Sequence, residues 1–450
     1  MAGLVAAVLI VPLMMVYALV YDRESQSETA QASITAGWGG PQTMTGPVLV
    51  IPYTSSSTET ETINGEQRTR SVQVRRELYV SPTRQAVETS IAPDRKGYAI
   101  YESVVYESEV EGQARFALPE ELPGVERDAL MLDEAQLRFG ISDSRGLKSD
   151  ARVAVNGAAV ELSPGNGPAA TGGSGFSTPA VWDGAEPLAV TWRYGVRGSR
   201  SLALVPRGGE TKWTVTSPWP HPSFTGGFLP DRREVTDAGF TATYDGITNL
   251  ALGRPLVAAS DQGPPIGDTM MVEPAMDPGM RSAGPSAIAT IGLVEPVDLY
   301  SQVDRAVKYG FLFIGFTFAA FLMFDIVGGA RVAPAEYLLT GAGLVLFFVM
   351  LLAFAEVVGF AVAYLIAAAA VIGLLTAYSA AVLGSWRRAG FIGAMLAGLY
   401  ALLFVLLNME TYSLLIGSLL LFAALAGIMY ATRGVNWSAV GRSDEEEALA

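Results

Sequence analysis

The 450-residue chain contains no cysteine and a single histidine, His221. The missing thiols exclude a disulfide framework, a thiolate metal site and a cysteine nucleophile. A single histidine also excludes sites that need several, such as HExxH zinc sites and pairs of haem ligands. A Ser-His-Asp triad stays open only if His221 is its base. The sequence therefore predicts no metal site and no cofactor.

Charged residues are scarce and unevenly distributed. Only 16% of the residues are charged, 50% are hydrophobic and the net charge is −14, while the mean hydropathy is +0.33. Such an acidic chain lacks the basic surface that phosphates need, so no nucleic-acid partner is expected. Residues 306–432 carry four basic and four acidic side chains, whereas residues 21–305 carry 24 basic and 36 acidic ones. This contrast predicts a membrane part and an acidic, water-exposed part that meet near Arg305.

The first hydrophobic run lies at the N-terminus. Residues 2–20 carry no charge and would form about 28 Å of helix at roughly 1.5 Å per residue, enough to cross a bilayer. A cleavable signal peptide is the alternative, because an A-x-A sequence occurs at residues 30–32. Charged residues separate that sequence from the hydrophobic run, so we expect an uncleaved anchor over residues 1–21. No basic residue precedes this run, which is unusual for either interpretation.

Five further hydrophobic segments complete the predicted membrane part, residues 306–432. Each is long enough to span a bilayer as a helix, the structure that satisfies its own backbone in lipid. Short loops with basic residues mark the cytoplasmic side, and they alternate here with loops that hold Glu356 or Glu410. The sequence thus predicts six transmembrane helices, cytoplasmic termini, residues 22–305 outside the cytoplasm and an acidic cytoplasmic tail over residues 433–450. The five helices are expected at residues 306–327, 336–355, 358–383, 389–407 and 411–431.

Residues 22–305 indicate mainly β-structure. Residues 21–40 are polar with helical propensity and are expected to continue the first helix. Asn156-Gly157 between two hydrophobic runs is typical of a type I′ hairpin. The fold class is thus a mixed membrane protein, with six transmembrane helices and a large, mostly antiparallel β domain in two layers or two subdomains. Strands are expected near residues 47–53, 72–80, 98–116, 187–198, 202–206, 211–217, 240–244 and 286–296.

The segment from Trp219 to Phe224 stands out in the β domain. Pro220 and Pro222 flank His221 and fix a stiff, extended backbone with few donors. No nucleophile motif accompanies His221, so we interpret it as part of a structural or interface loop, with a general base or a pH sensor as alternatives. The aromatic rings of Trp219 and Phe224 offer contact area and favour a surface that binds a partner.

Three ionisable residues of the membrane part are candidate functional residues, because charge is costly there. Asp325 lies near the cytoplasmic end of its predicted helix, and Arg331 follows in the loop, so the two are expected to pair. Glu356 lies at an outer helix boundary, where water is available. No predicted helix holds a mid-bilayer acid with a basic partner, and this pattern disfavours a secondary transporter.

Residues 217–240, 303–325 and 336–360 resemble the CreD family of bacterial inner-membrane, cell-envelope integrity proteins. The segments TGPVLVIPY and SDSRGL are similar to that family as well. The resemblance implies a Gram-negative inner membrane, a periplasmic domain over residues 22–305 and a role in envelope stress. In the family this role is tied to a two-component system and to colicin tolerance or β-lactam response. No catalytic residue is carried over, and this chain has Asp325 where we expect Glu.

We therefore expect an inner-membrane protein that supports envelope integrity by binding or scaffolding and is not an enzyme. Its expected partners are the lipid bilayer and other envelope proteins. One alternative is a transporter or channel, which needs a polar lining that the five C-terminal segments barely supply. The other is a periplasmic hydrolase, which needs His221.

Overall fold

The computed structural model divides the chain into two compact units, one of residues 1–29 with 297–450 and the other of residues 30–296. The predicted domain limits at 21/22, 305/306 and 432/433 refer to the bilayer surface, which these units do not define, so they remain predictions. The structure describes residues 2–63, 66–98, 101–120, 122, 124–261, 287–293, 299–311, 314–319, 321, 333–408, 415, 417–419, 422, 426, 429, 430 and 433.

The unit of residues 1–29 and 297–450 is helical. Helix α1 (Ala2–Trp38) is continuous, so the polar residues after Val20 prolong the hydrophobic run as the sequence predicts. Among the described residues, three helices are long and apolar enough to cross a membrane, and they match three predicted segments. These are α5 (Pro334–Val358), α6 (Phe360–Val382) and α7 (Trp386–Asn408), and the shorter α3 (Leu299–Lys308) precedes them.

The predicted number of six membrane helices goes beyond these three. Helix α1 carries the uncharged N-terminal run but is not one of the three. The segments predicted at residues 306–327 and 411–431 are described only in part: the first up to residue 321, the second at scattered positions. The six-helix count therefore remains a prediction.

Small residues let α6 and α7 approach each other closely. A Cβ atom at Gly393 of α7 would lie 2.5 Å from Oγ1 of Thr376 in α6, and Ala389 is fully buried. The hydroxyl of Tyr364 in α6 donates a hydrogen bond to the carbonyl oxygen of Tyr400 in α7 (2.7 Å). Small residues thus allow close approach at Gly393, whereas the rings of Tyr364 and Tyr400 fill another part of the contact between α6 and α7.

The unit of residues 30–296 consists mainly of two β-sheets. The nine-stranded sheet contains β1 (Gln42–Ile63), β2 (Glu66–Val80), β5 (Gln136–Ile141), β8 (Ser163–Pro164), β9 (Gly175–Pro179), β11 (Ser201–Val205), β13 (Pro222–Gly226), β16 (Val257–Ala258) and β17 (Ala289–Leu293). The eight-stranded sheet contains β3 (Arg84–Tyr98), β4 (Tyr101–Phe116), β6 (Arg152–Val155), β7 (Ala158–Val160), β10 (Leu188–Ser199), β12 (Glu210–Ser217), β14 (Arg232–Thr236) and β15 (Gly239–Thr248). Short helices link some strands: η1 (Arg127–Ala129), η2 (Leu132–Glu134), η3 (Ser144–Gly146), η4 (Ala169–Thr171) and α2 (Asn249–Leu252).

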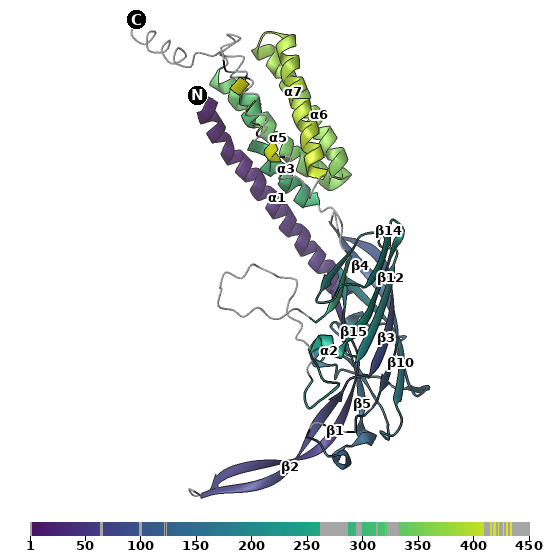
Figure 1. The fold of residues 1–450 in the computed structure, drawn as a ribbon. Helices are drawn as coiled ribbons and strands as arrows, with labels where there is room; N and C mark the ends of the chain where they lie inside the picture. The colour runs from purple at the N-terminus through teal and green to yellow at the C-terminus, as the bar shows by residue number, and fades with distance from the viewer. Residues whose placement is uncertain are drawn as a thin grey trace. The chain divides into compact units, whose positions relative to one another are not determined.

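The strand order confirms a mostly antiparallel β domain (Figure 1). In the nine-stranded sheet it is β13-β17-β11-β1-β5-β9-β8, with β2 beside β1 and β16 beside β2. In the eight-stranded sheet it is β14-β15-β12-β3-β4-β10-β6-β7. Among the described strands, only β1 with β11 and β12 with β3 pair in parallel.

Hydrophobic side chains of both sheets form one cluster, so the sheets pack face to face as two layers. Trp213 and Tyr106 are among its largest fully buried side chains. Their polar atoms have partners: Nε1 of Trp213 donates to Oγ1 of Thr89 (3.0 Å), and the hydroxyl of Tyr106 donates to the carbonyl oxygen of Ser201 (2.8 Å). Of the two predicted alternatives, two layers or two subdomains, the structure has two layers.

The predicted hairpin at Asn156-Gly157 is present between β6 and β7. Val155 lies opposite Ala158, which leaves a two-residue loop. Asn156 and Gly157 have φ angles of 50° and 82°. Two consecutive positive φ angles are what a type I′ turn requires.

Strand β1 divides one of its edges between two partners. Residues 42–45 pair in parallel with β11, and from Leu49 onward the strand pairs with β2 as far as Ile63 opposite Glu66. Strand β5, on the other edge, pairs with β1 only up to Val50. Beyond Tyr53, which forms a single bridge with Leu130, β1 and β2 extend as a two-stranded ribbon (Figure 1).

The C-terminal end of α1 is fixed within the β-rich unit by Trp38. Its Nε1 donates a hydrogen bond to the carbonyl oxygen of Tyr106 (3.3 Å). The guanidinium of Arg197 and the ammonium of Lys96 lie 4.9 and 5.2 Å from the centre of its ring, within range of cation–π attraction. Gly39 follows with φ +136°, and a Cβ atom there would lie 2.9 Å from the carbonyl oxygen of Arg197.

Candidate functional site

The predicted partner-binding segment lies where β12 leads into β13, an edge strand of the nine-stranded sheet. His221 is exposed, and Pro220 and Pro222 beside it are half-buried. Nε1 of Trp219 donates a hydrogen bond to the carbonyl oxygen of His221 (3.1 Å). The structure thus brings Trp219 and the backbone of His221 together, with a bend of the chain at Pro220 before β13 begins.

The aromatic side chains of this segment are turned partly toward the core. Trp219, Phe224 and Phe228 are half-buried against the hydrophobic cluster between the sheets. The ring of Phe224 meets Phe240 edge-on, with centroids 5.8 Å apart, and the guanidinium of Arg233 lies 6.0 Å from its centre. Part of the aromatic area predicted to face a partner is therefore used inside the unit, and the remainder is exposed around His221.

Of the three predicted membrane-region residues, the structure describes only Glu356. Asp325 and Arg331 lie outside the described residues. Glu356 lies near the C-terminal end of α5, with its side chain 12% exposed. Its Oε1 accepts a hydrogen bond from the hydroxyl of Tyr300 in α3 (3.3 Å) and lies 4.0 Å from Nε of Arg23 in α1. Glu356 is thus more enclosed than its predicted boundary position suggests, because residues of α1 and α3 surround it.

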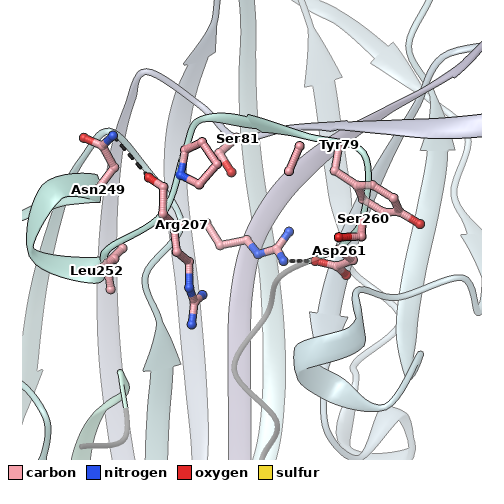
Figure 2. Close-up of a pocket in the computed structure, with 10 residues that line it drawn as sticks. Tyr79, Ser81, Arg207, Asn249, Leu252, Ser260 and Asp261 are labelled. Carbon is pink, nitrogen blue, oxygen red and sulfur yellow. Dashed lines mark hydrogen bonds and ion pairs between the residues drawn. The ribbon is translucent and has the colours of Figure 1, made fainter. Parts of the chain in front are cut away.

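A pocket that the sequence does not predict lies in the β-rich unit (Figure 2). Tyr79 and Ser81 come from the end of β2, Arg207 follows β11, and α2 supplies Asn249 and Leu252. The segment after α2 closes the pocket with Arg254, Pro255, Ala258, Ser260 and Asp261.

Local hydrogen bonds hold the walls of this pocket. Oγ1 of Thr248 caps α2 by accepting from the amide of Ala251 (3.3 Å), and the left-handed Gly253 (φ +64°) ends the helix. Nδ2 of Asn249 donates to the carbonyl oxygen of Arg254 (3.3 Å). Strand β16 then pairs with the end of β2. The loop that carries Arg254 and Asp261 is therefore fixed to the sheet at both ends.

Arg207 and Asp261 form a buried ion pair in this pocket (Figure 2), with side chains 6% and 8% exposed. Oδ2 of Asp261 also accepts a hydrogen bond from the amide of Ala169 (2.5 Å), in the Gly/Pro/Ser-rich segment 163–175. A buried ion pair is stable only when its remaining lone pairs and protons have partners. Asp261 therefore links three chain segments that are distant in sequence.

Tyr79 connects the pocket to a second polar group. Its hydroxyl donates to Oε2 of Glu77 (2.5 Å), and Arg138 binds both oxygens of that carboxylate at 2.6 and 3.2 Å. Burial and the hydrogen bond to Glu77 raise the pKa of Tyr79 to about 12. Burial opposes ionisation of Glu77, but the hydrogen bonds from Arg138 and Tyr79 outweigh it, so the pKa of Glu77 lies below its ordinary value. Tyr79 is thus a neutral hydroxyl at physiological pH.

The residues of this pocket carry no signal in the sequence. No sequence motif surrounds Arg207, Arg254 or Asp261. Asp261 lies near the start of a Pro/Gly-rich stretch that predicts a loop. They meet only because β2, β11 and the α2–β16 segment adjoin in the fold. Groups of three or more Asp, Glu or His residues that could hold a metal ion do not occur among the described residues.

Two solved structures that match part of this chain are only distantly similar to it. A mutant M1 zinc metallopeptidase from Deinococcus radiodurans, crystallised with a Tyr-Ser-Ala substrate, matches with a TM-score of 0.23 and 10% identity. The match covers 37% of this chain and 39% of that one. A two-domain M1 zinc metallopeptidase mutant bound to L-tryptophan gives a TM-score of 0.21 and 9% identity over the same shares. Similarity this low supports no conclusion about fold or activity.

The sequence comparisons cover almost the whole chain. The family described as "Inner membrane protein CreD" matches residues 1–438. The inner membrane protein CreD of Escherichia coli strain K12 is 31% identical over 449 residues, which is 98% of this chain and 93% of that protein. The predicted resemblance is confirmed, and the chain belongs to the CreD family of inner membrane proteins.

Proposed function

We propose that this chain supports cell-envelope integrity by binding other envelope components with its β-rich unit, and that it acts as a scaffold and not as an enzyme. Membership of an inner-membrane family and three apolar helices support a membrane-embedded scaffold. The observation that carries the binding role is the segment from Trp219 to Phe224, which leads into an edge strand.

Strand β13 has the features of a recognition edge. Among the described strands it pairs only with β17, so one edge of its backbone has no neighbouring strand. Such an edge can accept an extended peptide by backbone hydrogen bonds. The prolines and the Trp219–His221 hydrogen bond hold the approach to this edge in one shape, which lowers the entropy lost when a partner binds.

A complementation assay in a strain lacking the gene tests this role. Trp219→Ala should impair resistance to envelope stress, because it removes both ring area and the hydrogen bond to His221. Leu250→Ala is the matched control, since Leu250 is a hydrophobic side chain 86% exposed elsewhere on the unit, and it should leave resistance unchanged. Thermal melting of both purified chains separates loss of a contact from loss of folding.

His221 distinguishes binding from chemistry. His221→Gln keeps hydrogen-bonding capacity but cannot act as a base near neutral pH, so it should preserve envelope function. If this variant folds normally and abolishes function, the scaffold proposal is wrong and a hydrolytic or pH-sensing site at His221 replaces it. Crosslinking in native membranes, followed by mass spectrometry, should identify envelope proteins as partners of the wild-type chain.

We also propose the finer topology: six transmembrane helices, both termini in the cytoplasm and the β-rich unit in the periplasm of a Gram-negative cell. Support comes from the uncharged start of α1 and from the loops with Arg331, Arg387 and Arg388 that alternate with the acidic ones. Alkaline phosphatase fused after Leu250 should be active, and fused after residue 433 it should be inactive. An active C-terminal fusion would require another number of spans.

Glu356 supports a second candidate, a transporter or channel, because it is an enclosed acid that contacts α1 and α3. Ion flux into proteoliposomes that depends on Glu356 would favour this candidate. We propose instead that Glu356 has a structural role, since its carboxylate accepts a hydrogen bond from Tyr300 and faces Arg23. Ion flux should then be at background level in both the wild type and Glu356→Gln.

A further inference from the structure

The pocket between the end of β2 and the α2–β16 segment contains more positive than negative charge. Two guanidinium groups, Arg207 and Arg254, line it together with one carboxylate, Asp261. Asp261 pairs with Arg207. The guanidinium of Arg254 makes no hydrogen bond or ion pair in the part of the chain that the structure describes. Among the described residues, the charge of Arg254 is therefore left without a partner.

This surplus charge lies in an unfavourable environment. Arg254 is half-buried, and burial together with the nearby charge of Arg207 lowers its pKa below the usual arginine value. Two like charges in a partly desolvated site repel each other more strongly than they would in water. Asp261 offsets this only in part, because it also binds Arg207 and the amide of Ala169. Among the described residues, a further negative group beside Arg254 would offset its repulsion by Arg207.

The other polar side chains that line the pocket are suited to bind a negatively charged group. The hydroxyls of Ser81 and Ser260 line the cavity, and no hydrogen bond of either hydroxyl occurs among the described residues. The cavity has a volume of about 30 Å³, so it admits only a small group. Ser260 adjoins Asp261 on the wall opposite α2 (Figure 2). Arginine presents a planar fork of donors that matches the two oxygens of a carboxylate or phosphate.

We infer that this pocket binds the carboxylate or phosphate group of a small anionic solute, with Arg254 as its main ligand. Arg207 contributes positive charge while it stays paired with Asp261. Ser81 and Ser260 supply hydroxyl donors. The inference goes beyond the scaffold function proposed above and is independent of the Trp219 segment. It makes the β-rich unit a receptor for a small molecule as well as a surface for a larger partner.

Thermal melting of the purified full-length chain in detergent tests this inference. Tryptophan fluorescence reports mainly on the β-rich unit, because Trp38, Trp182, Trp192, Trp213 and Trp219 lie in it. Sodium phosphate or sodium acetate replaces sodium chloride at constant ionic strength and pH 7. A ligand that binds only the folded state raises the Tm in a saturable way. The anion that reaches half-saturation at the lower concentration identifies phosphate or carboxylate as the preferred group.

Arg254→Gln is the decisive variant, and Arg152→Gln, at an exposed position of β6, is the control with the same change of charge. The saturable rise in Tm should persist in the control and disappear in Arg254→Gln, leaving only the general effect of phosphate on protein stability. Without either anion, Arg254→Gln should melt at the wild-type temperature or above it, because the unpaired charge is removed. Equal responses of the wild type and Arg254→Gln would overturn the inference. So would a lower Tm or unfolding of Arg254→Gln in chloride alone, since Arg254 would then stabilise the fold without a ligand.

Discussion

At the scale of single residues, Asp261 has the strongest structural role in the pocket. It binds the guanidinium of Arg207 and the amide of Ala169, and both carboxylate and guanidinium are almost fully buried. Removing one member of a buried ion pair leaves the other charged and without compensation, which costs far more than breaking an exposed pair. Asp261 should therefore matter for stability even if the pocket is empty.

Asp261→Asn should lower the free energy of unfolding by about 3–5 kcal/mol, because Arg207 would stay buried without its counter-ion. Glu210→Gln is the control: it breaks the pair with Arg84 (3.3 Å), whose side chains are 58% and 79% exposed, and should cost about 0–1 kcal/mol. Denaturant unfolding followed by tryptophan fluorescence measures both. A similar small loss for both variants would show that Arg207 finds solvent or another partner.

Glu77 predicts a dependence of stability on pH. Its pKa in the folded state lies below the ordinary value of 4.5, since hydrogen bonds from Arg138 and Tyr79 outweigh burial. A lowered pKa contributes stability that is complete above the unfolded-state pKa and is lost as the pH falls through the folded-state pKa. The Tm of the wild type should therefore fall more steeply below pH 4.5 than that of Glu77→Gln. Glu161→Gln, at an exposed position, should keep the wild-type slope.

At the scale of helices and strands, the sequence predicts elements whose partners are close in the chain or whose hydrophobic pattern is strong. The hairpin at Asn156-Gly157 and the helices α5, α6 and α7 are of this kind. Strand β3 is not among the strands predicted from the sequence, because Pro93 and the charged residues after it suggest a turn. In the fold, β12 pairs with β3 only as far as Ser90, so Pro93 needs no donor on that side.

The pocket between β2 and the α2–β16 segment cannot be predicted from the sequence for a related reason. Ala169 and Arg207 lie 92 and 54 residues from Asp261, and such contacts leave no periodic pattern in the sequence. In the segment from Trp219 to Phe224, the predicted extended backbone is present only from the start of β13, and the sequence predicts neither the bend at Pro220 nor the half-burial of the rings. That burial depends on Phe240 and Arg233, which β15 and β14 bring alongside.

The end of α1 offers a test of how an element is attached. Gly39 needs φ +136° and lies against the carbonyl of Arg197, so Gly39→Ala should destabilise the β-rich unit by about 1–3 kcal/mol. Gly37→Ala is the control two residues earlier: it lies in the helix with open space around its Cβ position and should be neutral or stabilising by up to about 1 kcal/mol. Thermal or denaturant unfolding of the two variants makes the comparison. Equal effects would mean that the contact with Arg197 does not constrain the end of α1.

At the scale of the whole molecule, α1 bears on how the N-terminus is processed. The A-x-A sequence at residues 30–32 lies inside the continuous helix, and Ala30 is 8% exposed. A protease needs an extended, accessible segment, so we expect the hydrophobic run to remain attached. N-terminal sequencing of the membrane-purified protein should find a terminus within residues 1–20 or upstream of them. A terminus at Ser33 would identify a signal peptide and would remove one proposed span.

From the divided edge of β1 we expect a definite order in which the β-rich unit assembles during synthesis. The hairpins of β1 with β2 and of β3 with β4 involve neighbouring segments and can form early. Residues 42–45, however, wait for residues 202–205 of β11. At about 5–20 residues per second, the ribosome needs roughly 8–32 s to supply that partner. During this interval residues 42–45 leave the backbone edge that β11 later covers without a partner, so a chaperone that binds extended strands is most needed before β11 emerges.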